Sequence, residues 1–198
     1  MFELAYFFWK RSKTVSAITV LTHETATLAA IAYLAINVNF TAAFFSFILP
    51  FNLVRFGMMQ GNWVQHSFIE RSNPFGGGLH NSITLINCQY NRECFNDGYH
   101  ASHHLHPRRH FLDHPAELLK NRLQYFKSNA IVFKQTSYDE LWFLLMTKNY
   151  ETLADKWVHV GTPQTTPSKA EIMANLKEKT LIFTLPQLMK NHATSKDE

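Results

Sequence analysis

Histidines concentrate in one short stretch of the chain, NDGYHASHHLHPRRH, which runs from Asn96 to His110 and holds five of the eleven histidines. His103 and His104 follow His100 by three and four residues, so on a helix the three side chains lie on one face, about one turn apart. Neutral imidazole is a common ligand of transition metals. The spacing therefore predicts a metal site.

A second segment upstream, NWVQH, adds two candidates. Asn62 and His66 are four residues apart, again on one helical face. We expect His66 to bind the same metal, and Asn62 to bind it weakly or to hold a bound water. Asp97 comes just before the histidine cluster, where its carboxylate can accept the second ring N–H of a ligating histidine and fix the tautomer.

The alternative for the histidine stretch is a solvated basic run, and we prefer that interpretation for the later histidines: His106, His110 and His114. Isolated histidines elsewhere are expected to be surface or hydrogen-bonded polar residues: His23, His80, His159 and His192. Cys88 and Cys94 are separated by five residues, outside the usual zinc-ligand spacing. We expect both cysteines to be core or loop residues.

The composition and the motifs narrow the function classes. Only 17% of the 198 residues are charged and the net charge is +4, a weak excess that fits either a nucleic-acid face or an anionic lipid surface. Arg108 and Arg109 alone do not make a basic face with interleaved aromatics, so we expect no nucleic-acid partner. The chain has no GxSxG, P-loop or paired-carboxylate motif.

Two apolar runs precede these motifs. Residues 14–36 and 38–54 each approach the length of a membrane-spanning helix, and NVN at 37–39 predicts a turn between them. His23 and Glu24 interrupt the first run and must face protein, water or the interface. Basic residues flank both ends of the pair, which places both ends in the cytosol. The alternative is a buried helical pair in a soluble core.

The remainder of the chain is more polar. Residues 71–78 predict a loop, residues 115–126 and 137–158 predict amphipathic helices, and residues 78–91 are compatible with either a strand or a short helix. We predict an all-α fold: a membrane helical hairpin at 1–60, a cytosolic helical cap carrying the histidines at 61–160, and a linker with a short helix and tail at 161–198.

DGYHASHHLHP resembles the third histidine box of the membrane fatty acid desaturase family, and GNWVQHSFIE resembles the segment that precedes that box. WFLLMTKNYETLADKWV is also similar to the family's tail helix, so the resemblance covers about residues 14–158. It implies that His66, His100, His103 and His104 are direct ligands of iron and that Asn62 reaches iron through water.

The resemblance further implies a non-haem di-iron enzyme that uses O₂ to remove hydrogen from an acyl chain, giving a double bond or, in relatives, a hydroxyl. The implied partners are a membrane lipid substrate and an electron donor such as cytochrome b5 or ferredoxin. The implied location is integral to the membrane, in the endoplasmic reticulum if the source is eukaryotic, with the histidine box facing the cytosol.

The sequence departs from the family pattern because the first and second histidine boxes are absent. Four direct ligands cannot fill two iron sites, so we expect no complete di-iron centre and no desaturase activity from this chain alone. Three hypotheses follow: the C-terminal portion of a longer desaturase, a non-catalytic membrane-binding relative, or a lipid or alkane hydroxylase of the same superfamily.

Overall fold

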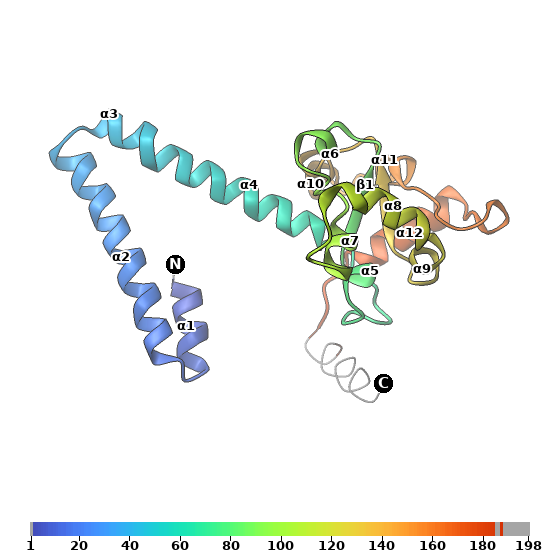
Figure 1. Ribbon diagram of the computed structural model, residues 1–198, viewed down its shortest axis with the longest axis horizontal. Coiled ribbons are helices and arrows are strands. Elements are labelled where there is room, and N and C mark those ends of the chain that lie inside the picture. Colours follow the sequence, from blue (N-terminus) through green and yellow to red (C-terminus); the bar gives the residue numbers. More distant parts are fainter. Residues whose placement is uncertain (1, 185–186, 188–198) are drawn as a thin grey trace. The chain divides into compact units, whose positions relative to one another are not determined.

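The computed structural model describes residues 2–184 and Gln187, and the chain divides into two compact units, residues 1–58 and 59–198. The first unit begins with two helices that pack on each other, α1 (Phe2–Lys10) and α2 (Thr14–Asn37) (Figure 1). A continuous helical run follows, composed of α3 (Phe40–Ala43), the π-helix η1 (Phe44–Ile48) and α4 (Leu49–Gln65).

The turn at residues 37–39 and the π-helix both follow from local sequence. The side chain of Asn39 accepts the N–H of Ala42, which caps the new helix as α2 ends. Pro50 lacks an N–H and its ring crowds the carbonyl four residues earlier. The wider π turn just before it accommodates that defect without ending the helix.

Two helices are long and apolar enough to cross a membrane, Thr14–Asn37 and Phe40–Gln65, with 24 and 26 residues. The last residues of the second helix belong to the second unit, which begins at residue 59. Only 6% of the apolar window in each is buried within the structure, whereas a core helix of a soluble protein is mostly buried. Apolar side chains such as Val15, Ile36 and Phe45 are exposed along them. The second helix continues past the expected boundary at residue 60 and ends at Gln65.

The chain is mostly helical, in line with the prediction, but the second unit also contains a parallel two-stranded sheet that the predicted all-α fold did not include. β1 (Ile83–Ile86) pairs with β2 (Ile131–Lys134), with Ile83 opposite Ile131. Helices nevertheless dominate the structure (Figure 1). The sequence left residues 78–91 open between a strand and a short helix, and it did not indicate the second strand. Short, mostly apolar runs such as ITLI and IVFK fit a buried strand and a buried helical turn equally well.

Parallel strands need a long crossover connection, and here the crossover carries the histidine-rich helix. It contains α6 (Gln89–Glu93), α7 (His100–Leu105), the 3₁₀ helix η2 (Phe111–Asp113), α8 (His114–Lys120) and α9 (Arg122–Lys127). α7 packs on β1 and on the short helix α5 (Gly78–Asn81), which precedes that strand. The strand pairing therefore fixes where the histidines lie.

Alternating strand residues supply two hydrophobic cores, one on each face of the sheet. Ile83, Leu85 and Phe133 are fully buried among residues of α10, α11 and α12, including Leu141, Leu153 and Leu176. The other core contains residues from α5, α7, α8, α9 and β2, such as Leu79, Ala101, Leu118, Tyr125 and Val132.

After β2 the chain continues through α10 (Tyr138–Met146), α11 (Tyr150–Lys156), the 3₁₀ helix η3 (Pro163–Thr165) and α12 (Lys169–Lys179). The single helix predicted over 137–158 is thus two helices, because Lys148 has a positive φ of 54° and Asn149 caps α11. The helix predicted over 115–126 is likewise divided at Asn121. His192 lies outside the described residues.

α12 belongs to the core of the second unit rather than to a detached tail. Ser168 and Glu171 form a capping box that starts the helix, and Leu176 is fully buried against the core. We therefore predict that Leu176→Ala destabilises the fold by about 2–5 kcal/mol. Ile182→Ala is the control, because Ile182 is 91% exposed and should change stability by less than about 0.5 kcal/mol. Chemical denaturation of the detergent-solubilised chain measures both.

Candidate metal centre

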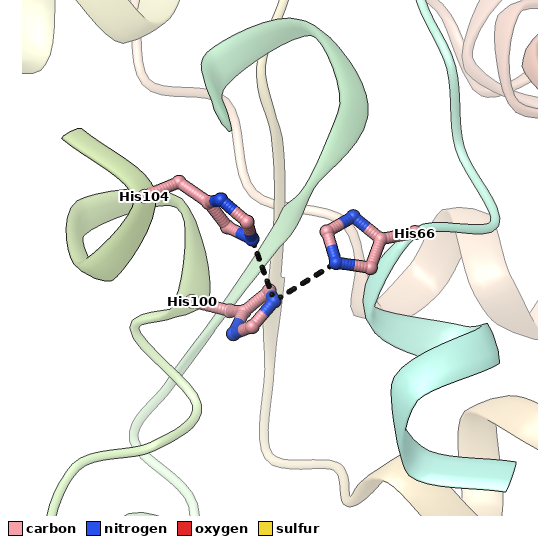
Figure 2. Close-up of side chains that lie close together, drawn as sticks. All are labelled: His66, His100 and His104. Carbon is pink, nitrogen blue, oxygen red and sulfur yellow. Dashed lines mark hydrogen bonds between the residues drawn. The ribbon is translucent and has the colours of Figure 1, made fainter. Parts of the chain in front are cut away.

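Three histidines from two distant segments converge on one point. Nε2 of His100 lies 3.1 Å from Nε2 of His66 and 3.0 Å from Nε2 of His104. Figure 2 shows the three rings facing one another, His66 from the end of α4 and the other two from α7. One nitrogen from each ring lies within 4.8 Å of the others, so the group can hold a metal ion.

Local geometry brings α7 close enough for this convergence. His100 and His104 are four residues apart and share one face of the helix. Gly78, at the start of α5, lies so close to α7 that a Cβ added there would clash with the Cβ of His104. The glycine run at 76–78 was predicted as a loop, so this steric role was not foreseen.

The hydrogen bonds of His66 settle its tautomer. Its Nδ1 is 2.8 Å from the carbonyl oxygen of Asn81, which can only accept, so Nδ1 carries the proton and Nε2 of the neutral ring presents a lone pair. His100 then needs an Nε2–H to bond His66. That protonated nitrogen cannot also accept a bond from His104. Among neutral rings, protons satisfy at most one of the two contacts, whereas a cation satisfies all three nitrogens.

The surroundings favour the neutral form of His100 and of His104. His100 is only 9% exposed, and burial together with the neighbouring histidines His104 and His66 lowers its pKa to about 3. Burial, His66 and His103 also lower the pKa of His104, although this side chain is exposed. Neutral imidazole is the form that binds metals, and histidine suits zinc, copper, iron and nickel.

The nitrogen separations match those of a shared metal ion. Two nitrogens that are each about 2.0–2.1 Å from one ion lie about 2.8–3.0 Å apart when the angle between them is near 90°, and about 3.3–3.4 Å apart when that angle is tetrahedral. Two of the three separations, 3.0 and 3.1 Å, fall between these limits, and all three are within 4.8 Å. The donor set therefore fits a transition-metal ion.

Two other predicted metal-site residues lie beside this group. His103 is exposed, and its ring centroid is 5.9 Å from those of His100 and His104. Asn62 is an exposed residue in the last turn of α4. A direct bond from His103 to metal and a water-mediated contact from Asn62 both stay predictions.

Asp97 does not have the predicted role of accepting a ring N–H from a ligating histidine. Its Oδ2 accepts hydrogen bonds from Tyr90 Oη at 2.9 Å and from Gln65 Nε2 at 3.2 Å. Asp97 precedes α7 in a loop rather than lying on the ligand face, so its carboxylate points to the end of α4. Among the described residues, Nδ1 of His100 is buried without a hydrogen-bond partner.

A polar network around Ser102 connects α7 to the residues that follow it in the chain. Ser102 Oγ is 2.9 Å from Nδ1 of His114 and accepts a 2.7 Å hydrogen bond from Arg109, which also pairs with Glu117 at 3.1 Å. His114 is 6% exposed, so its predicted place in a solvated run was wrong. Burial and Arg109 lower the pKa of His114. The reason is the contact of His114 with Ser102 of α7, which the local sequence around His114 does not reveal.

The remaining histidines and the cysteines have ordinary surroundings. His106 and His110 are exposed, as predicted, and His110 Nδ1 accepts the N–H of Leu112. His80 donates to the carbonyl of Gly76, His159 contacts Thr162 and Thr165, and His23 is exposed on α2. Cys88 and Cys94 are free thiols of intermediate exposure.

Comparisons with known proteins add no assignment. No protein-family model, no curated protein and no solved structure matches the chain. The interpretation of the site therefore depends on its own geometry.

We predict that the purified chain binds at most one tightly held Co²⁺ or Fe²⁺ ion through the three converging nitrogens. His66→Ala, His100→Ala and His104→Ala should each weaken binding at least about tenfold, because each removes a nitrogen ligand. His106→Ala is the matched control and should leave the Kd unchanged. Spectrophotometric Co²⁺ titration and iron analysis measure this. His103→Ala tests the fourth predicted ligand, and two tightly held ions per chain would contradict the prediction.

Proposed function

We propose that this chain is the metal-binding C-terminal portion of a membrane fatty acid desaturase-like protein. The observation that carries the proposal is the convergence of Nε2 from His66, His100 and His104, with the His66 tautomer fixed by Asn81. This group comes from the same two segments, NWVQH and DGYHASHHLHP, that resemble the family's metal-binding segments.

Iron at this site would supply activation of O₂ for hydrogen removal from an acyl C–H bond. The protein's own residues would hold the ion and orient its ligands: α7 presents two imidazoles from one face, and Asn81 sets the ring of His66. The apolar helices α2 and α3–α4 would keep the chain where acyl substrates are found. Electrons would come from an external donor such as cytochrome b5 or ferredoxin.

The number of nitrogens limits what this sequence can do by itself. The converging group has three ligands, and His103 raises the set to four. A two-iron site of the desaturase kind needs about twice that number, so we propose that further ligands come from outside this sequence. The same count supports a second candidate, a membrane-bound metal-binding relative without oxidative activity.

We further propose that the helical pair is a transmembrane hairpin whose two ends face the cytosol. Lys10, Arg11 and Lys13 flank its start and Arg71 lies beyond its end, an arrangement that the positive-inside rule favours for cytosolic ends. Arg55 lies within α4, ten residues before its end at Gln65. In a eukaryotic cell the membrane would be the endoplasmic reticulum, with the histidines on the cytosolic side.

Cysteine labelling tests this topology. In a Cys88→Ser/Cys94→Ser background, Ser12→Cys and Phe95→Cys should react with a membrane-impermeant maleimide added to the cytosolic side of sealed vesicles. Val38→Cys, in the turn of the hairpin, should react only after the membrane is permeabilised. Equal labelling of Val38→Cys and Ser12→Cys in sealed vesicles would exclude the hairpin.

Product analysis tests the proposed activity. The protein expressed from its complete coding region should change the cellular acyl chains, and His100→Ala or His104→Ala should abolish the change, while His106→Ala should not. Gas chromatography with mass spectrometry distinguishes a new double bond from a hydroxyl, which separates a desaturase from a hydroxylase. Unchanged acyl chains from a protein that binds metal would favour the non-catalytic relative.

A further inference from the structure

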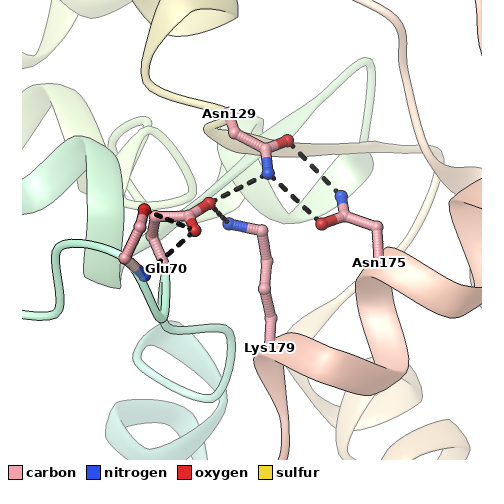
Figure 3. Close-up of polar contacts among 5 residues, drawn as sticks. Glu70, Asn129, Asn175 and Lys179 are labelled. Carbon is pink, nitrogen blue, oxygen red and sulfur yellow. Dashed lines mark hydrogen bonds and ion pairs between the residues drawn. The ribbon is translucent and has the colours of Figure 1, made fainter.

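A buried ion pair joins α12 to the segment that follows α4. Nζ of Lys179 lies 2.6 Å from Oε2 of Glu70, and the two side chains are only 3% and 17% exposed. Asn129 donates to the same carboxylate oxygen at 2.9 Å, and Asn129 and Asn175 exchange hydrogen bonds with each other (Figure 3). Ser72 Oγ donates to the other oxygen of Glu70 at 3.0 Å.

Burial alone would raise the pKa of Glu70, but Lys179, Asn129 and Ser72 together lower it to about 2. Such a pair is poor evidence for stability, because removing two charges from water costs about as much as their attraction returns. Methionine side chains of similar volume would fill the same space. What the ion pair supplies and methionine cannot is a directional connection between two particular segments.

Backbone hydrogen bonds link the ion pair to the segment that contains His66. The N–H of Ile69 donates to the carbonyl of Lys179 at 3.0 Å, and the N–H of Glu70 donates to the carbonyl of His80 at 2.7 Å. The next residue after His80 is Asn81, whose carbonyl accepts the Nδ1 proton of His66. The segment 66–70 is thus fastened at both ends, to Asn81 at one end and to α12 at the other.

We propose that Glu70 and Lys179 are positioning residues for the metal centre: their ion pair fastens the 66–70 segment so that Nε2 of His66 points at His100 and His104. This inference rests on the proposed metal binding. α12 stays attached to the second unit without the pair because Leu176 is buried in the core. The pair therefore sets the alignment of His66, and the core sets the attachment of the helix.

The test uses the full-length chain in lipid nanodiscs and the double variant Glu70→Met/Lys179→Met. This variant should fold with an unfolding temperature equal to or above that of the wild type, because it removes two buried charges and keeps their volume. Its Kd for Co²⁺ should nevertheless rise about five- to tenfold, somewhat less than the effect of removing a direct partner of a ligand.

The matched control is Glu140→Met/Lys156→Met. This pair has a separation of 2.8 Å, and its other hydrogen bonds are to Thr136 and Gln135 rather than to the His66 segment. It should leave the Kd for Co²⁺ unchanged. Lys179→Arg keeps the charge pair and should retain a Kd within about twofold of the wild type. If the double variant weakened binding only by lowering general stability, the control variant Glu140→Met/Lys156→Met should weaken binding as well.

A second readout needs no metal. Hydrogen–deuterium exchange of peptides covering residues 66–82 should be faster in the double variant. The amides of Ile69 and Glu70 keep their acceptors, the backbone carbonyls of Lys179 and His80, but the ion pair no longer holds the two segments together. An unchanged Kd together with unchanged exchange overturns the inference. Wild-type protein that fails to bind Co²⁺ overturns the proposed metal function instead, and the exchange result then decides alone whether the pair fastens this segment. If the double variant does not fold, Lys179→Gln gives the same two readouts.

Discussion

The candidate centre depends on the pairing of two short parallel strands. β1 and β2 cannot be joined by a tight turn, so the 44 residues between Ile86 and Ile131 must leave the sheet and return. That crossover lays α7 against β1, while the residues just before β1 supply Gly78 and Asn81, the close contact of α7 and the acceptor for His66. The placement of α7, its close contact with Gly78 and the tautomer of His66 therefore all depend on β1 and the residues just before it.

Buried polar groups complete what the strands begin. α7 has six residues, too few to be stable as an isolated helix, so tertiary contacts must hold it. Its inner face packs on the sheet, and Ser102 binds Arg109 and His114 of the following segment. On the other side of the centre, Asp97 joins the loop before α7 to Gln65, next to His66. The histidines are therefore held by residues outside the three-histidine group.

Sequence patterns predicted the features that depend on local spacing. The i, i+4 relation of His100 and His104 and the two long apolar helices are of this kind, and the turn at 37–39 follows from three residues. β1 was left open between a strand and a short helix and β2 was not predicted, because four mostly apolar residues are too few to show a period. Asp97 and His114 were misjudged because their partners, Gln65 and Ser102, are distant in the sequence or on another helix. The acceptor for His66 is the backbone carbonyl of Asn81, which any residue type would supply, so residue identity does not indicate it. α12 packs into the core through the buried Leu176.

The close contact at Gly78 also constrains how this protein can diverge. A Cβ added at position 78 would clash with the Cβ of His104, so the restriction on this ligand falls on a neighbouring position that has no chemistry of its own. A relative could keep every histidine of the centre and still lose their alignment through one added methyl group. To recognise relatives that retain the site, one must therefore check the glycine before β1 as well as the histidines. The histidine spacing alone indicates common descent, but it does not show that the three nitrogens can converge.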